Sequence, residues 1–191
     1  MSKPTFAIIL CEDNLTFTLL RKYLQRCGVD RRSIRPEVSP SGRGAAEGWV
    51  IRNFPAQVDA YRISKAKKDT WLIVAIDADR GTVASRIEQL NSSLRNCGNP
   101  RLQNIDPAVE RIARFVPRRN VETWILVLSG TPGNEMEDFS EQKQKEEWHE
   151  LIGPAIEEFY EWTRPNATLP ERCLPSLRHA IDELRHLSIT R

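Results

Sequence analysis

Acidic residues follow two apolar runs of the sequence without any spacer. Glu12 and Asp13 come directly after the first run, and Asp77 and Asp79 come directly after the second. Short, continuously apolar runs are typical of strands that are buried on both faces of a parallel sheet. Ligands of such sheets bind beyond the carboxyl ends of the strands. We therefore expect these four acids to gather at one edge of a sheet.

Carboxylates that converge in this way repel one another, and a hard cation such as Mg²⁺ or Mn²⁺ relieves the repulsion. Such an ion can bridge phosphate oxygens and prepare a water or hydroxyl group for in-line attack. The alternative is helix capping, because Asp13 and Asp79 each precede an expected helix. Capping explains one acid at each strand end but not two. We predict a divalent metal site at this edge, with Glu12, Asp77 and Asp79 as its ligands.

The elements that must position these acids alternate between strands and helices. Strands are expected at 6–11, 33–38, 70–76 and 111–116. Helices are expected at about 14–27, 45–61, 83–94, 121–128, 148–162 and 174–187, with Pro154 kinking or restarting the fifth. This alternation predicts an α/β fold with a mostly parallel sheet, helices on both of its faces and a C-terminal helical extension.

Length and composition suit one domain with an appendage. The 191 residues are 40% hydrophobic and 28% charged, as in ordinary globular proteins. We place a catalytic domain at 1–130 and the helical extension at 131–191. The four cysteines are scattered without a CxxC pair, which argues against a zinc site and favours a reducing compartment. The sequence has no apolar stretch of about 20 residues and no signal peptide, so we expect a cytoplasmic protein without membrane contact.

Charge is distributed unevenly, although the net charge is only +2. Between Arg21 and Lys68 there are 12 basic residues and 4 acidic ones, whereas between Glu135 and Glu161 there are 10 acids and 2 lysines. The basic half can attract a polyanion such as nucleic acid. The alternative is that the two stretches are solvated faces of opposite sign.

Four motifs, in this order, resemble those of the Toprim domain, which serves topoisomerases, primases and the nucleases of the overcoming-lysogenization-defect type. They are Cys11-Glu12-Asp13, Gly42-Arg43-Gly44, Asp77-Ala78-Asp79-Arg80 and the stretch from Pro117 to Leu126 that carries Glu122 and Trp124. The sequence is most similar to small stand-alone Toprim-like proteins, which are often encoded beside an ABC-type ATPase and linked to defence against phage. The similarity spans about 5–128. It departs from the group at Asp13, where Gly is usual, and at Arg43, where Lys is common.

This resemblance implies a nuclease that depends on Mg²⁺ or Mn²⁺, cleaves DNA or RNA and is controlled by an ABC-type ATPase partner in antiphage defence. Glu12 would be a general acid/base or a metal ligand, and Asp77 and Asp79 would be metal ligands. Glu122 would complete a second metal site, although a Glu in the first turn of a helix also complements the helix dipole. The residues implied for phosphate or nucleic-acid binding are Arg43, Arg80, Arg118 and Arg119.

Two other interpretations stay open. The run that ends in Glu12-Asp13, followed by an amphipathic helix, also resembles the start of a response-regulator receiver domain, in which a later Asp accepts a phosphoryl group. The chain between Glu12 and Asp77 is longer than a receiver needs there, and Pro-Arg-Arg stands after Val116 where a receiver needs a Lys. The third interpretation is a non-catalytic module that docks on an ATPase, with the aromatic-rich stretch 148–162 as its surface.

Overall fold

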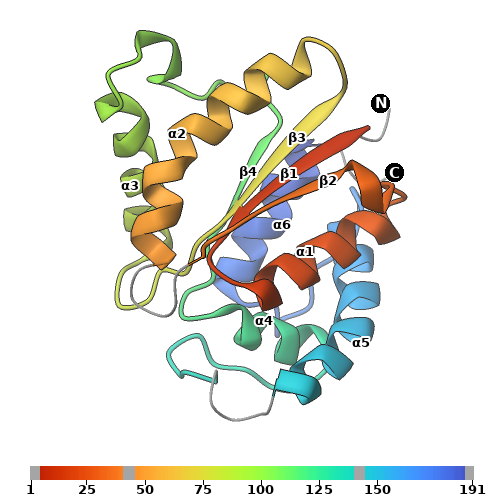
Figure 1. Ribbon diagram of the computed structural model, residues 1–191. Helices are drawn as coiled ribbons and strands as arrows, with labels where there is room; N and C mark the ends of the chain where they lie inside the picture. Colours follow the sequence, from red (N-terminus) through yellow and green to blue (C-terminus); the bar gives the residue numbers. More distant parts are fainter. Residues whose placement is uncertain (1–4, 41–45, 140–144, 188–191) are drawn as a thin grey trace.

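A four-stranded parallel sheet forms the centre of the computed structural model, which describes residues 5–40, 46–139 and 145–187 (Figure 1). Its strands are β1 (Phe6–Cys11), β2 (Ile34–Val38), β3 (Thr70–Ala75) and β4 (Ile112–Phe115). They lie in the order β2-β1-β3-β4, and every neighbouring pair is parallel. The expected α/β fold with a parallel sheet is confirmed.

Within the described residues, six α-helices connect and follow the strands. They are α1 (Asn14–Arg26), α2 (Ala46–Lys65), α3 (Val83–Asn96), α4 (Val121–Leu128), α5 (Lys145–Thr163) and α6 (Pro175–Leu187), with 3₁₀ turns η1 (Arg31–Ser33) and η2 (Pro100–Leu102). The second helix is longer than expected, and α5 continues through Pro154, so the expected restart at this proline is wrong. Because a proline lacks only one backbone donor, packing of the surrounding turns can hold such a helix together.

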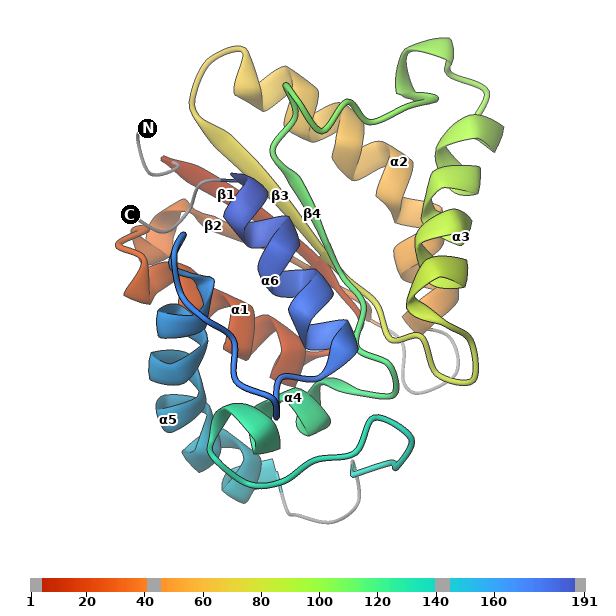
Figure 2. The same ribbon diagram turned by 180° about the vertical axis from the view of Figure 1, so that it is seen from behind.

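The two faces of the sheet are covered by different helices (Figures 1 and 2). Successive strand residues point to opposite faces, so Ile8 and Leu10 of β1 pack under α2 and α3, whereas Ala7 and Ile9 face the other side. That other side is covered by α1, α4, α5 and α6. Helices on both faces explain why β1 and β3 read as continuous apolar runs.

The C-terminal helices pack into the main core. Phe159 of α5 lies 4.6 Å from Tyr23 and 6.4 Å from Phe115 between ring centroids. On α6, Glu183 accepts the backbone N–H of Arg114 at 2.9 Å and pairs with its guanidinium at 3.0 Å, so α6 covers the outer edge of β4. The segment after residue 130 therefore supports the sheet, while the domain boundary at 130 stays a prediction.

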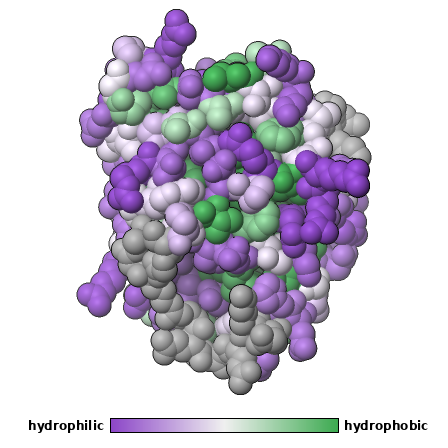
Figure 3. All heavy atoms as spheres, in the orientation of Figure 1, coloured by the Kyte–Doolittle hydropathy of each residue, from purple (hydrophilic) through white to green (hydrophobic). Residues whose placement is uncertain are grey.

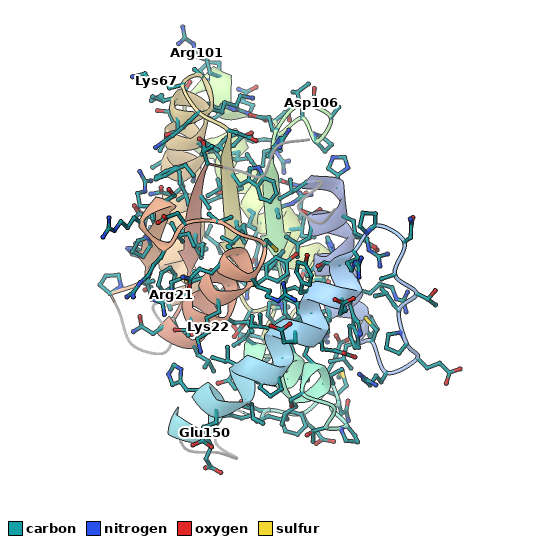
Figure 4. The ribbon with its side chains drawn as sticks, turned by 90° about the vertical axis from the view of Figure 1, so that its right-hand side faces the viewer. Arg21, Lys22, Lys67, Arg101, Asp106 and Glu150 are labelled. Atoms are coloured by element: carbon teal, nitrogen blue, oxygen red, sulfur yellow. The ribbon has the colours of Figure 1, made fainter. Side chains whose placement is uncertain are left out.

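The surface shows where the charged residues lie. On the face in Figure 3, hydrophilic residues surround separate groups of hydrophobic ones. In Figure 4, Arg21 and Lys22 lie on α1, whereas Lys67 projects from the far end of the molecule. The basic residues of the first half are thus divided between distant places. None of the helices within the described ranges is long and apolar enough to cross a membrane.

Candidate functional site

The two acid-bearing strand ends lie side by side. β1 and β3 pair in parallel with Cys11 opposite Ala75, so Glu12 and Asp77 leave the sheet at the same edge. The carboxylate Oε1 of Glu12 accepts the backbone N–H of Asp77 at 3.2 Å. The chain passes from β1 to β2 on one side and later to β3 on the other, and such a switch point between β1 and β3 is where parallel sheets of this strand order bind ligands.

The carboxyl groups of Glu12 and Asp77 are both strongly perturbed. Burial is the main cause that raises the pKa of Glu12 from 4.5 to about 7, and the charges of Asp79 and Asp13 add to the effect. Asp77 keeps some exposed surface, yet protein surrounds it densely, and this desolvation raises its pKa well above the usual range. Negative charge on Glu12, Asp13, Glu122 and Asp79 raises it further. The charges of four other acids therefore act on the carboxyl group of Asp77.

Asp13 and Asp79 have different local roles. Asp13 is the N-cap of α1, since its Oδ1 accepts the Thr16 N–H at 2.8 Å. Asp79 caps no helix, because Thr82 and Ser85 form the capping box of α3. Its backbone has a φ of 52°, in the left-handed region that few residues other than glycine adopt. Capping thus accounts for Asp13 and leaves Asp79 unexplained, at a backbone position of the kind often found at functional sites.

A buried arginine, Arg86 of α3, contacts Asp79. Its side chain is only 6% exposed, and its Nη2 lies 3.5 Å from Asp79 Oδ2. The same guanidinium pairs with Glu47 of α2 and donates to Gln89 at 2.6 Å. The positive charge of Arg86 also lowers the pKa of Glu12, against the larger effect of burial. Arg86 is thus a buried positive charge beside these carboxylates, and it was not among the residues predicted from the sequence.

The described donor set suits a hard divalent cation by its chemistry. The donors are carboxylate oxygens that repel one another at a partly buried strand edge, and Mg²⁺ and Mn²⁺ favour such ligands. The described side chains nevertheless include no group of three His, Cys, Asp or Glu placed to hold one ion. Two of these side chains have protein partners instead: Glu12 accepts the Asp77 N–H, and Asp79 is paired with Arg86. A shared ion stays a prediction.

The other predicted residues are distributed around this edge. Glu122 lies in the first turn of α4, and its charge reaches Asp77. Arg119 lowers the pKa of Asp79, against the larger effect of burial, and therefore lies near that carboxyl group. Arg118 lines a cavity between α3 and α6, and Arg80 is exposed on the loop before α3. Arg43 and its two flanking glycines lie outside the described residues.

Comparisons with known proteins add no relative. The chain matches no protein-family model, no curated protein and no solved structure.

Proposed function

We propose that this protein is a divalent-metal-dependent nuclease of the Toprim type. The observation that carries the proposal is the junction of β1 and β3, where Glu12 contacts the backbone of Asp77 and several carboxylates raise the pKa of Asp77. A cluster of mutually repelling carboxylates at the ligand-binding edge of a parallel sheet favours cation binding. The four motifs of the sequence support the same conclusion.

In this proposal Glu12, Asp77 and Asp79 would hold the ion, and Asp79 would give up its pair with Arg86 to do so. A bound Mg²⁺ or Mn²⁺ ion supplies charge neutralisation at the phosphate and an activated water. Glu122 is the candidate ligand of a second ion. Arg119 and Arg80 would orient the phosphate backbone, because the planar guanidinium matches phosphate oxygens. The fixed sheet edge places these groups before the substrate arrives.

A cleavage assay tests the proposal. Purified protein is incubated with supercoiled DNA and with a structured RNA, in Mg²⁺, in Mn²⁺ and in EDTA, and products are resolved on gels. We expect cleavage only with metal, and its loss by orders of magnitude in Asp77→Ala, because the ion supplies several kcal/mol of transition-state stabilisation. The matched control is Asp59→Ala, which removes an exposed carboxylate from α2. Full activity of a folded Asp77→Ala variant would refute the proposal.

We also propose that an ABC-type ATPase controls this activity. The resemblance is the main support, together with the lack of a GxxxxGK[ST] phosphate-binding loop in the sequence. The acidic α5 is the candidate docking surface, and Glu150 projects from it at one end of the molecule (Figure 4). Charge reversal in Glu150→Lys should weaken co-purification with an ATPase encoded beside this protein. Asp106→Lys, at the opposite end, is the control. Equal recovery with both variants would contradict docking through α5.

A receiver-like phosphoacceptor is the second candidate. One observation favours it: the order β2-β1-β3-β4 matches the first four strands of the flavodoxin-like arrangement that receivers share, with acids at the ends of β1 and β3. A small acyl phosphate and Mg²⁺ should then phosphorylate Asp77, and mass spectrometry would detect the added phosphoryl group. The nuclease proposal predicts no such modification.

A further inference from the structure

A cavity opens between the first turns of α3 and α6, beside the segment that follows β4. Its volume is about 430 Å³, which lies within the range of roughly 300–1,000 Å³ typical of small-molecule sites. Figure 2 shows the beginnings of α3 and α6 at the same end of the sheet. We call it the α3–α6 pocket, and the lining residues that matter here are Val83, Ile87, Arg118, Glu135, Ser176 and His179.

The pocket lies next to the carboxylate edge, by which we mean the carboxyl ends of β1 and β3 with Glu12, Asp77 and Asp79. Backbone contacts connect the two places. Arg118 follows Pro117, whose carbonyl accepts the N–H of Ala78 at 2.8 Å, and Ala78 stands between the two aspartates of the β3 end. On the opposite wall, Val83 begins α3 four residues after Asp79. If one phosphate of a nucleic acid lies at these carboxylates, the adjacent nucleotide can therefore reach this pocket.

The walls of the pocket differ in chemistry. Val83 and Ile87 present apolar surface from α3, and His179 faces the cavity from α6. Arg118 contributes a guanidinium whose Nη1 is buried and has no hydrogen-bond partner within the described part of the chain. A buried N–H without an acceptor is costly, so a shift of the Arg118 side chain toward an anionic acceptor in the cavity would relieve that cost.

Among the described lining residues the carboxylate is that of Glu135, and it is already engaged. Glu135 accepts the backbone N–H of Ser176 at 2.8 Å and its hydroxyl, at the N-terminus of α6. The first-turn donors of the helix thus compensate the charge of Glu135. Trp124 of α4 donates to the same Ser176 hydroxyl at 2.8 Å, which fixes the start of α6 beside α4. An incoming anion would meet Arg118 and His179 rather than a free carboxylate.

We propose that the α3–α6 pocket binds one nucleotide of the nucleic-acid substrate, adjacent to the bond that is cut. The base packs on Val83 and Ile87, and the phosphate accepts hydrogen bonds from Arg118 and His179. The inference rests on the proposed nuclease function and specifies how the substrate is held. Because α6 and residue 135 lie beyond the Toprim-like stretch, the pocket gives the C-terminal extension a role in substrate binding.

Titration of the full-length protein with adenosine 5′-monophosphate in EDTA, followed by calorimetry, tests the proposal. Wild type should bind this nucleotide more tightly than it binds inorganic phosphate or adenosine, because the pocket contacts both the base and the phosphate of the nucleotide. Arg118→Gln should weaken binding about tenfold or more, the loss expected for a charge-assisted hydrogen bond. Ala84→Trp, which places an indole at the pocket wall, should weaken it by at least as much.

Two matched controls should bind like wild type. Arg31→Gln removes an exposed guanidinium from η1, and Ala56→Trp adds an indole to the exposed side of α2. Circular dichroism verifies that all variants fold. Binding that survives both pocket variants, phosphate that binds as tightly as the nucleotide, or a wild type that binds no nucleotide would each overturn the proposal. The EDTA titration needs no catalysis, whereas cleavage in Mg²⁺ tests the nuclease function, so the two failures are distinguishable.

Discussion

At the scale of single residues, Arg86 decides how the carboxylate edge is arranged. A buried guanidinium needs counter-charges, and Arg86 finds them in Asp79 and Glu47, whose side chains are partly exposed. The pair with Asp79 engages this carboxylate, whose charge also acts on Glu12 and Asp77. Metal binding and the Asp79–Arg86 pair are therefore expected to compete.

Replacement of Arg86 by methionine tests this competition. Arg86→Met should lower the free energy of unfolding in EDTA by about 1–3 kcal/mol, because it leaves two carboxylates without their partner. Mg²⁺ should raise the melting temperature of this variant more than that of wild type, since Asp79 is then free to join the ion. Thermal unfolding with and without Mg²⁺ measures both effects.

The matched control is Arg95→Met on the same helix. Arg95 pairs with Glu88 where both side chains are exposed, so its loss should cost less than about 1 kcal/mol and leave the response to Mg²⁺ unchanged. An equal Mg²⁺ response in Arg86→Met and wild type would contradict the competition.

Glu12 should make the stability of the metal-free protein depend on pH. Its pKa is about 7 in the folded chain, against an ordinary value of 4.5, so the folded state binds this proton more tightly than the unfolded state does. The resulting stabilisation is fully present below pH 4.5 and is lost as the pH rises through 7. Urea unfolding in EDTA should show lower stability at pH 8 than at pH 5. Glu12→Gln should reduce this difference, and an unchanged difference would contradict the role of Glu12.

At the scale of elements, a buried ion pair attaches α2 to the segment before β4. Glu110 is 5% exposed, and Arg62 of α2 contacts both of its oxygens, at 2.6 Å and 2.8 Å. Arg62 also donates to the carbonyl of Asn104 at 2.6 Å. Hydrogen bonds from Arg62 lower the pKa of Glu110, although burial is the largest single effect and opposes them. The carboxylate therefore depends on this arginine.

Arg62→Ala should destabilise the protein by about 3 kcal/mol, because it leaves Glu110 buried and charged with few partners. Arg164→Ala, which breaks the exposed pair with Glu161, should cost less than about 1 kcal/mol. Urea denaturation of the two variants beside wild type measures the difference. Similar small losses in both would show that Glu110 relaxes toward solvent.

Sequence patterns were sufficient to predict most of these elements. The apolar runs at β1 and β3 and the spacing of Val83, Ile87 and Leu90 in α3 gave strands and helices close to their observed bounds. The weakly patterned β2 was also found, whereas the end of α2 was predicted four residues early. Helix ends depend on packing as well as local signals, which is why their bounds are harder to predict than their existence.

The candidate site was predicted only in part, for a physical reason. Glu12 and Asp77 lie close together because both follow strands that run in parallel and end at the same side of the sheet. The alternation of strands and helices in the sequence was enough to predict this parallel arrangement. The pairing of Asp79 with Arg86 depends on how α3 packs against α2, which no local pattern encodes. One signal was available: Arg86 stands three residues after Val83 and four before Leu90, so a charge falls on the apolar face of α3.

At the scale of the whole molecule, the C-terminal segment belongs to the structure that holds the site. Trp148 and Phe159 of α5 and Leu177 and Ile181 of α6 are buried in the same core as the sheet. Without this segment, a large apolar surface over β4 and α1 would meet water. The Toprim-like stretch alone therefore lacks part of its core.

Deletion of 131–191 should abolish cooperative folding. We expect residues 1–130 alone to lose near-ultraviolet circular dichroism and to show no sharp thermal transition, while the full chain shows both. A cooperative transition in the short chain would contradict this expectation and support an independent domain that ends at 130. Docking of a partner on α5 is accordingly tested best with surface substitutions in the full chain.

Anomalous X-ray scattering from crystals grown with Mn²⁺ would show whether Glu12 and Asp77 hold a divalent ion, on which the proposed nuclease activity depends. We predict an anomalous peak within bonding distance of carboxylate oxygens of both residues, with Asp79 separated from Arg86, and no such peak in Asp77→Ala crystals. Crystals in which Mn²⁺ binds elsewhere, while Asp79 still pairs with Arg86 and no peak lies between Glu12 and Asp77, would contradict this proposal.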